Sequence, residues 1–125
     1  MIRERLKKKY DNGNKREKYK ATFKRFGTRS GYKGEVRTIL LIDIVDQRHF
    51  LVASHIWLDC GKQFDKINLI EGDRVQFHAR VKIYEKGYAG YDEFGEKGFT
   101  TFDYGLSYPS KVSKLHHEYN IKKDN

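Results

Sequence analysis

The stretch from Gly72 to Gly90, GDRVQFHARVKIYEKGYAG, constrains the fold more than any other part of the chain. Its apolar residues recur at every second position, which is the period of a β-strand with one buried face. The positions between them carry amide, imidazole, guanidinium, ammonium and phenol groups, with no carboxylate before Glu85. We therefore expect a strand that buries Val75, Phe77, Ala79, Val81 and Ile83 and turns Gln76, His78, Arg80, Lys82 and Tyr84 the other way.

Four further strands and one short helix are expected around this strand. The strands are predicted at Tyr19–Phe26, Arg37–Asp46, Phe50–Cys60 and Tyr104–Leu115, where β-branched and aromatic residues concentrate. Apolar residues spaced by three between Gly61 and Asp73 predict the helix. Residues 27–35 and 86–105 are glycine-rich connections, the first a hairpin loop or wide turn. Three strands, a helix and two strands form the order of an OB-fold, a five-stranded Greek-key barrel, so we expect a mostly β chain of this kind.

The two ends of the chain differ from this region. We divide the chain into a basic N-terminal arm (1–18), an OB-fold domain (19–115) and a polar C-terminal tail (116–125). The first twenty residues hold nine Lys or Arg against three Asp or Glu. We expect a mobile arm there, with a short helix that has Ile2, Leu6 and Tyr10 on one side as the alternative.

The charge and the aromatic content of the chain favour a polyanionic partner. The formal net charge is +9, and Lys and Arg neutralise phosphates and release counterions when they bind nucleic acid. Many small basic proteins have no such partner, and that alternative stays open. Aromatic residues make up 14% of the chain, more than one core of this size can bury, so some should reach the surface.

One cysteine excludes an internal disulfide and indicates a reducing compartment. No apolar run approaches the length that spans a bilayer, and the N-terminus lacks the apolar stretch of a secretory signal. We therefore expect a cytoplasmic protein of a bacterial or phage-infected cell with no membrane association.

The candidate site is a basic surface interleaved with aromatic rings. Cations can follow the phosphates of a single strand, and exposed rings can stack on its unpaired bases. The candidate nucleic-acid-binding residues are Arg25, Phe26, Arg29, Tyr32, Lys33, Arg37, His55, Trp57, His78, Arg80, Lys82, Tyr84, Lys86 and Tyr88.

Core packing is the competing explanation for several of the aromatic residues. Phe23, Phe64 and Phe77 are expected in the core, whereas Trp57 is equally compatible with the core and with a ligand platform. Tyr84 and Tyr88 lie beyond the most apolar part of their strand and are expected to be exposed.

The run HIWLDCGKQFDKINLIEGDRVQFHARVKIYEKGY resembles the centre of bacterial and phage single-stranded-DNA-binding proteins. In that family a strand with an aromatic residue is followed by a short helix, and a glycine with a polar residue opens the fourth strand, where EGDRV stands here. The chain is most similar to small proteins of this kind from phages or mobile elements of Gram-positive bacteria. The resemblance covers residues 19–115 and implies an OB-fold that binds single-stranded DNA.

Catalytic and metal motifs are missing from the sequence. GTRSGYKG lacks the spacing of a P-loop, and a single cysteine cannot form a C-x-x-C zinc motif. We therefore predict no enzymatic activity, no cofactor and no metal. The predicted function is binding of single-stranded nucleic acid, with DNA favoured over RNA. The alternative is a phage or mobile-element protein that inhibits a host protein such as a defence nuclease complex, in the manner of an anti-CRISPR, because Tyr, Trp and Arg also dominate protein interfaces.

Overall fold

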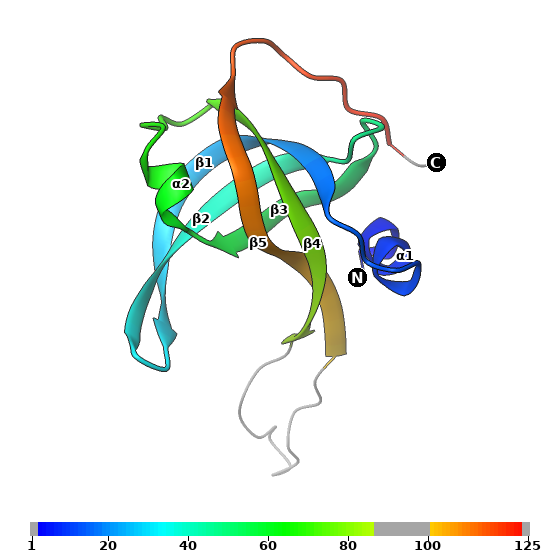
Figure 1. Ribbon diagram of the computed structural model, residues 1–125, viewed down its shortest axis with the longest axis horizontal. Helices are drawn as coiled ribbons and strands as arrows, with labels where there is room; N and C mark the ends of the chain where they lie inside the picture. The colour runs from blue at the N-terminus through cyan, green and yellow to red at the C-terminus, as the bar shows by residue number, and fades with distance from the viewer. Residues whose placement is uncertain (1–2, 87–100, 124–125) are drawn as a thin grey trace, which may run out of the picture.

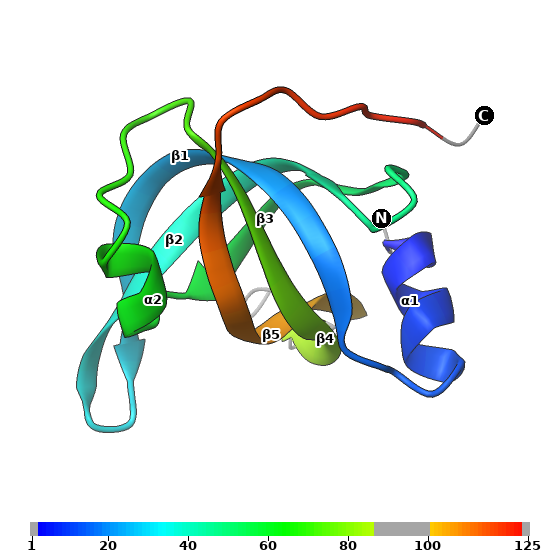
Figure 2. The same ribbon diagram turned by 45° about the horizontal axis from the view of Figure 1, so that its top comes forward.

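Five antiparallel strands form one open sheet in the computed structural model, which describes residues 3–86 and 101–123. The strands are β1 (Glu17–Gly31), β2 (Gly34–Val45), β3 (Leu51–Asp59), β4 (Arg74–Lys86) and β5 (Thr101–Leu115). Their order in the sheet is β3-β2-β1-β4-β5, so β3 and β5 are the edge strands. The sheet curls strongly (Figures 1 and 2), and the two edge strands contact each other. The expectation of a mostly β chain with five strands is confirmed.

The two-residue period of β4 predicts its buried face correctly over most of the strand. Val75, Phe77, Ala79 and Val81 are at most 3% exposed, and they pack into the core beneath the curled sheet. Ile83 departs from the pattern and is 44% exposed, although Tyr104 opposite it on β5 is buried. Burial of each large side chain stabilises the fold by about 1.5–3 kcal/mol.

The hairpin between β1 and β2 is longer than the sequence indicates. Residues 27–31, expected in a wide loop, continue β1 and pair with β2 as far as Gly31 opposite Gly34. Only Tyr32 and Lys33 form the turn, and Gly34 follows with a positive φ of 115°, which glycine adopts without strain. The glycines of this segment therefore belong to paired strands, because the backbone ladder compensates for their weak strand propensity.

The predicted helix between the third and fourth strands is α2 (Lys62–Asp65). It contributes Phe64, which is fully buried and meets the ring of Phe77 edge-on at 5.9 Å between ring centroids. Phe23 is also buried, at 4% exposed, so all three phenylalanines predicted in the core lie there.

The N-terminal residues contain a second helix, α1 (Glu4–Asp11). Of the two states expected for this segment, the structure shows the short helix and not a mobile arm. Leu6 is fully buried in the core cluster, and α1 contacts β3, β4 and β5. The ammonium of Lys9 lies 2.8 Å from the Glu17 carboxylate and 3.1 Å from that of Asp46 at the end of β2. A leucine anchor and partly buried ion pairs therefore hold the helix against the sheet, beside the strands in Figure 2.

The C-terminal segment crosses back over the sheet after β5 (Figure 1). The hydroxyl of Tyr119 donates a hydrogen bond to the carbonyl of Asp43 (2.9 Å) and lies 2.8 Å from the hydroxyl of Thr22. Lys122 then forms a parallel bridge with Phe50 at the start of β3. Polar contacts therefore fasten the described part of this segment to β1, to β2 and to the turn between β2 and β3.

Candidate nucleic-acid interface

Trp57 lies on the surface of β3. The strand buries Ile56 and Leu58, each 1% exposed, and turns His55 and Trp57 to the other side. Trp57 is 40% exposed, so it does not belong to the core, and its role as a ligand platform stays a prediction. An apolar ring of this size on the outer side of a strand is available for contact with a partner.

The ring of Trp57 lies across the sheet toward β1. A Cβ atom added to Gly27 would be 2.9 Å from Cζ3 of the indole, so any larger residue at position 27 would push the ring away. The guanidinium of Arg25 lies 5.1 Å from the ring centroid, within the range of a cation–π contact. The exposed indole therefore packs against Gly27 of β1 and has the positive charge of Arg25, two residues away on the same strand, next to it.

A pocket of about 390 Å³ opens beside Trp57 where the edge strands approach each other. Its floor includes the buried residues Ile56 and Leu58. Five of the predicted site residues line it, namely Arg29, His55, Trp57, Lys82 and Tyr84. The sequence did not indicate four other polar or small residues of its wall, namely Arg3, Thr38, Asp59 and Gly105. We call these nine residues and their floor the Trp57 pocket.

Arg3 bridges the two edge strands within the Trp57 pocket. Its guanidinium donates hydrogen bonds to the carbonyl of His55 on β3 (3.0 Å) and to that of Tyr104 on β5 (2.9 Å). It also donates to the hydroxyl of Tyr84 (3.1 Å). These bonds satisfy strand-edge carbonyls that no neighbouring strand reaches. Only a three-dimensional arrangement could reveal this role, because Arg3 is more than fifty residues from each partner.

Arg29 is already paired within the pocket. Its guanidinium forms two hydrogen bonds with the Asp59 carboxylate, at 2.8 and 2.7 Å. These bonds hold the pKa of Asp59 below its usual value, and the charges of Arg29 and Lys82 lower that pKa further. Asp59 therefore stays ionised at neutral pH and reduces the positive charge that Arg29 offers to a ligand. Lys82 has no ion-pair partner among the described residues.

The other predicted site residues form separate groups. The guanidinium of Arg37 stacks over Phe26 at 4.1 Å from the ring centroid and pairs with Asp65 at 3.3 Å. Tyr32 and Lys33 are exposed at the tip of the β1–β2 hairpin. His78 and Arg80 lie farther along the outer face of β4. Tyr88 and the side chain of Lys86 lie outside the described residues.

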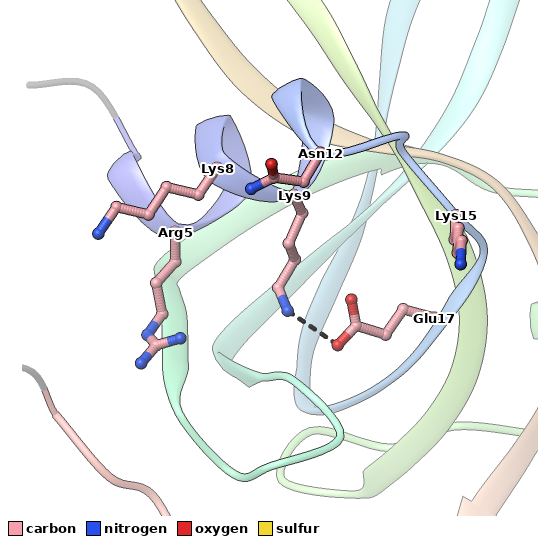
Figure 3. Close-up of a pocket in the computed structure, with 6 residues that line it drawn as sticks. All are labelled: Arg5, Lys8, Lys9, Asn12, Lys15 and Glu17. Carbon is pink, nitrogen blue, oxygen red and sulfur yellow. Dashed lines mark hydrogen bonds and ion pairs between the residues drawn. The ribbon is translucent and has the colours of Figure 1, made fainter.

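A second basic hollow lies between α1 and the start of β1 (Figure 3). Arg5, Lys8, Lys9 and Lys15 line it, together with Asn12 and Glu17. Lys9 pairs with Glu17 and Asp46, and Arg5 lies 3.7 Å from Asp46 and stacks over Phe50. Lys8 and Lys15 lie at opposite ends of the hollow in Figure 3. Its cations therefore hold the helix to the sheet or point apart, and they do not converge on one point.

Comparison with protein-family models, with curated proteins and with solved structures finds no match. Within residues 3–86 and 101–123, no group of three or more His, Cys, Asp or Glu side chains could hold a metal ion. No helix in that part of the chain is long and apolar enough to cross a membrane.

Proposed function

We propose that this protein binds single-stranded nucleic acid on the face that carries Trp57, and that it does so without catalysis. The observation that carries the proposal is an exposed indole that lies beside Arg25 and the cations of the Trp57 pocket. Stacking of a base on an exposed ring contributes about 1–3 kcal/mol and tolerates any base, while cations follow the phosphates.

The architecture supports an OB-fold for this function. A curled sheet with the order β3-β2-β1-β4-β5, contact between β3 and β5, and a helix between β3 and β4 agree with the connectivity of a five-stranded barrel. In OB-folds the face of the second and third strands, the first loop and the loop between the fourth and fifth strands take the ligand. Trp57 lies on the corresponding face here. The resemblance to small phage and mobile-element proteins that bind single-stranded DNA favours DNA over RNA.

The pocket suits one unstacked base better than a duplex. It combines the apolar ring of Trp57 with the polar edges of His55 and Tyr84. A base inside a duplex is already stacked and paired, so it cannot enter without the cost of unpairing. Lys82 at the same pocket can meet the phosphate that follows such a base.

Fluorescence anisotropy tests this proposal with labelled oligo-dT of about 16 nucleotides, a length at the upper end of the usual site size. Duplex DNA of equal length serves as competitor, at about 50 mM and about 200 mM salt. We expect binding that weakens roughly 20-fold across this salt range, as three neutralised phosphates would give, and that duplex does not displace. Binding that duplex displaces equally would reject the proposal and direct attention to a protein partner of the same surface.

A further inference from the structure

A second group of cations lies on the outer face of β4, beyond the Trp57 pocket. Lys18 on β1 stands opposite His78 on β4, and His78 stands opposite Ser110 on β5. Lys111 follows Ser110, and Arg16 reaches the same place from the residues before β1. Three segments that are distant in sequence therefore bring Arg16, Lys18, His78 and Lys111 together.

The ladder between β4 and β5 is distorted at this point. Its register shifts on both sides of His78, between Gln76 and His78 and between His78 and Arg80. The facing part of β5 holds two non-glycine residues in the left-handed region, Tyr108 (φ 52°) and Lys111 (φ 50°). Bulges of this kind redirect side chains, and strained backbone concentrates at functional sites.

Arg16 holds this distorted segment in place. Its guanidinium donates hydrogen bonds to the carbonyl of Tyr108 and to the hydroxyl of Ser110, the latter at 2.9 Å. Tyr108, whose carbonyl accepts the first of these bonds, is 79% exposed. The bulge thus presents a cation, a hydroxyl and an exposed ring together on the surface.

The charges that act on His78 are all positive. Burial lowers the pKa of His78, and Lys111, Lys18 and Arg16 lower it further. Its neighbours along β4 are Gln76 and Arg80, and Lys20 stands opposite Gln76 on β1. Among the described residues no carboxylate is a cause of the lowered pKa of His78, in contrast to the acidic partners of Arg29 and Lys9. Cations gathered without a counter-charge repel one another, and a bound anion would relieve that repulsion.

We propose that Arg16, Lys18, His78 and Lys111 form a second anion site, which takes a phosphate of the strand whose bases reach the Trp57 pocket. This part of the inference rests on the proposed function. The outward residues of β4 connect the two sites in the order His78, Arg80, Lys82 and Tyr84. At the rise of a β-strand this row spans roughly 20 Å, so the sites would contact different nucleotides of one strand.

NMR titration of the histidine rings with pyrophosphate tests the anion site without any nucleic acid. A bound anion stabilises the imidazolium, so pyrophosphate should raise the pKa of His78 and should bind more tightly as the pH falls through it. The His78→Gln variant assigns the signal, and the four other histidines serve as internal references. If pyrophosphate leaves the pKa of His78 unchanged, or shifts the pKa of all five histidines equally, the proposed anion site is wrong.

A pair of variants checks which side chains form the site. Lys18→Gln combined with Lys111→Asn should abolish the effect of pyrophosphate on His78, and asparagine tolerates the left-handed backbone at position 111. Lys66→Gln on exposed Lys66 after α2 removes the same kind of charge elsewhere and should leave the effect intact. The single Lys111→Asn variant provides a milder change if the double variant unfolds. An unchanged effect in folded variants that lack these lysines would contradict the assignment.

Two lengths of oligo-dT separate this site from the Trp57 pocket. The double variant should bind an oligomer of about 16 nucleotides three- to tenfold more weakly and one of about 4 nucleotides as the wild type does. If pyrophosphate binds at His78 but the longer oligomer is unaffected, the site serves a free phosphate compound, and its link to the strand is wrong. If neither oligomer binds the wild type, the proposed function fails, while the pyrophosphate titration still decides the anion site.

Discussion

The hollow beside α1 and the Trp57 pocket are both basic, but their cations have different partners. In the hollow, Lys9 pairs with the buried carboxylate of Asp46 and with Glu17, so the charge holds the helix to the sheet. At the pocket, Asp59 pairs with Arg29, but Lys82 has no ion-pair partner among the described residues, and Arg25 lies against the exposed ring of Trp57 beside it. Positive charge therefore indicates a binding surface only where carboxylates do not already neutralise it. Four variants, ordered by expected effect, test this contrast.

Replacement of Asp46 should give the largest effect, and it should affect stability. Asp46 is 1% exposed, accepts hydrogen bonds from the amides of Arg48 and Phe50, and meets Lys9 at 3.1 Å. Asp46→Asn leaves the Lys9 ammonium with weaker compensation and should lower the free energy of unfolding by about 2–3 kcal/mol, measured by urea denaturation.

The matched control for that variant is Asp11→Asn, which removes an exposed carboxylate paired with Lys7 at 3.0 Å. It should change the free energy of unfolding by less than about 0.5 kcal/mol, since exposed helical pairs contribute little. Equal effects of the two substitutions would show that α1 is not held by the buried pair.

Trp57→Ala should produce the largest change in affinity. Loss of one stacked base costs about 1–3 kcal/mol, which corresponds to roughly 5- to 150-fold weaker binding of oligo-dT in the anisotropy assay. Trp57→Phe keeps a ring and should retain most of the affinity. The exposed position of Trp57 predicts a small change in unfolding midpoint. If a folded Trp57→Ala protein binds oligo-dT with wild-type affinity, the ring of Trp57 does not contribute to binding.

Asp59→Asn should strengthen binding. The substitution releases Arg29 from its two hydrogen bonds and removes a negative charge from the Trp57 pocket, so we expect three- to tenfold tighter binding of oligo-dT. Glu71→Gln is the matched control, because it also releases a cation, Lys24, but away from the pocket. If both variants gain equally, only net charge matters and the local geometry does not.

Removal of two positive charges from the hollow beside α1 should have the smallest effect on oligo-dT affinity. Lys8→Gln together with Lys15→Gln should change oligo-dT affinity by less than about twofold at about 200 mM salt, where charges beyond a Debye length are screened. The single substitution Lys82→Gln should weaken binding by more than that double variant. If the double variant weakens binding more than Lys82→Gln in the same anisotropy assay, the binding site lies at α1 and not at the Trp57 pocket.

Much of the fold could be predicted from local patterns in the sequence. The alternation of β4 identified its buried residues, and the three-residue spacing before Gly72 located α2 with Phe64 beneath the sheet. These signals are local, because side-chain direction in a strand or helix follows from sequence spacing alone. The glycines at 27 and 31 misled the prediction, since pairing with β2 extends β1 through them.

The missing parts of the candidate site depend on contacts between distant residues. Arg3 reaches β3 and β5 only because Leu6 and Lys9 anchor α1, and Asp59 meets Arg29 across the sheet. Neither pairing follows a spacing that the sequence displays. Lys82 and Tyr84, on a strand with a clear period, could be assigned to the outer face in advance, whereas Trp57 could not, and all three line the Trp57 pocket.

The fluorescence of Trp57 tests the central claim most directly, because it is the single tryptophan of the chain. Its emission would be followed during titration with oligo-dT and, separately, with duplex DNA of the same length. Stacking of a base on the indole predicts strong quenching by oligo-dT, a titration midpoint that rises with salt, and little response to duplex. Unchanged emission while oligo-dT binds, or equal quenching by duplex, would contradict the assignment of this face as the site for single strands.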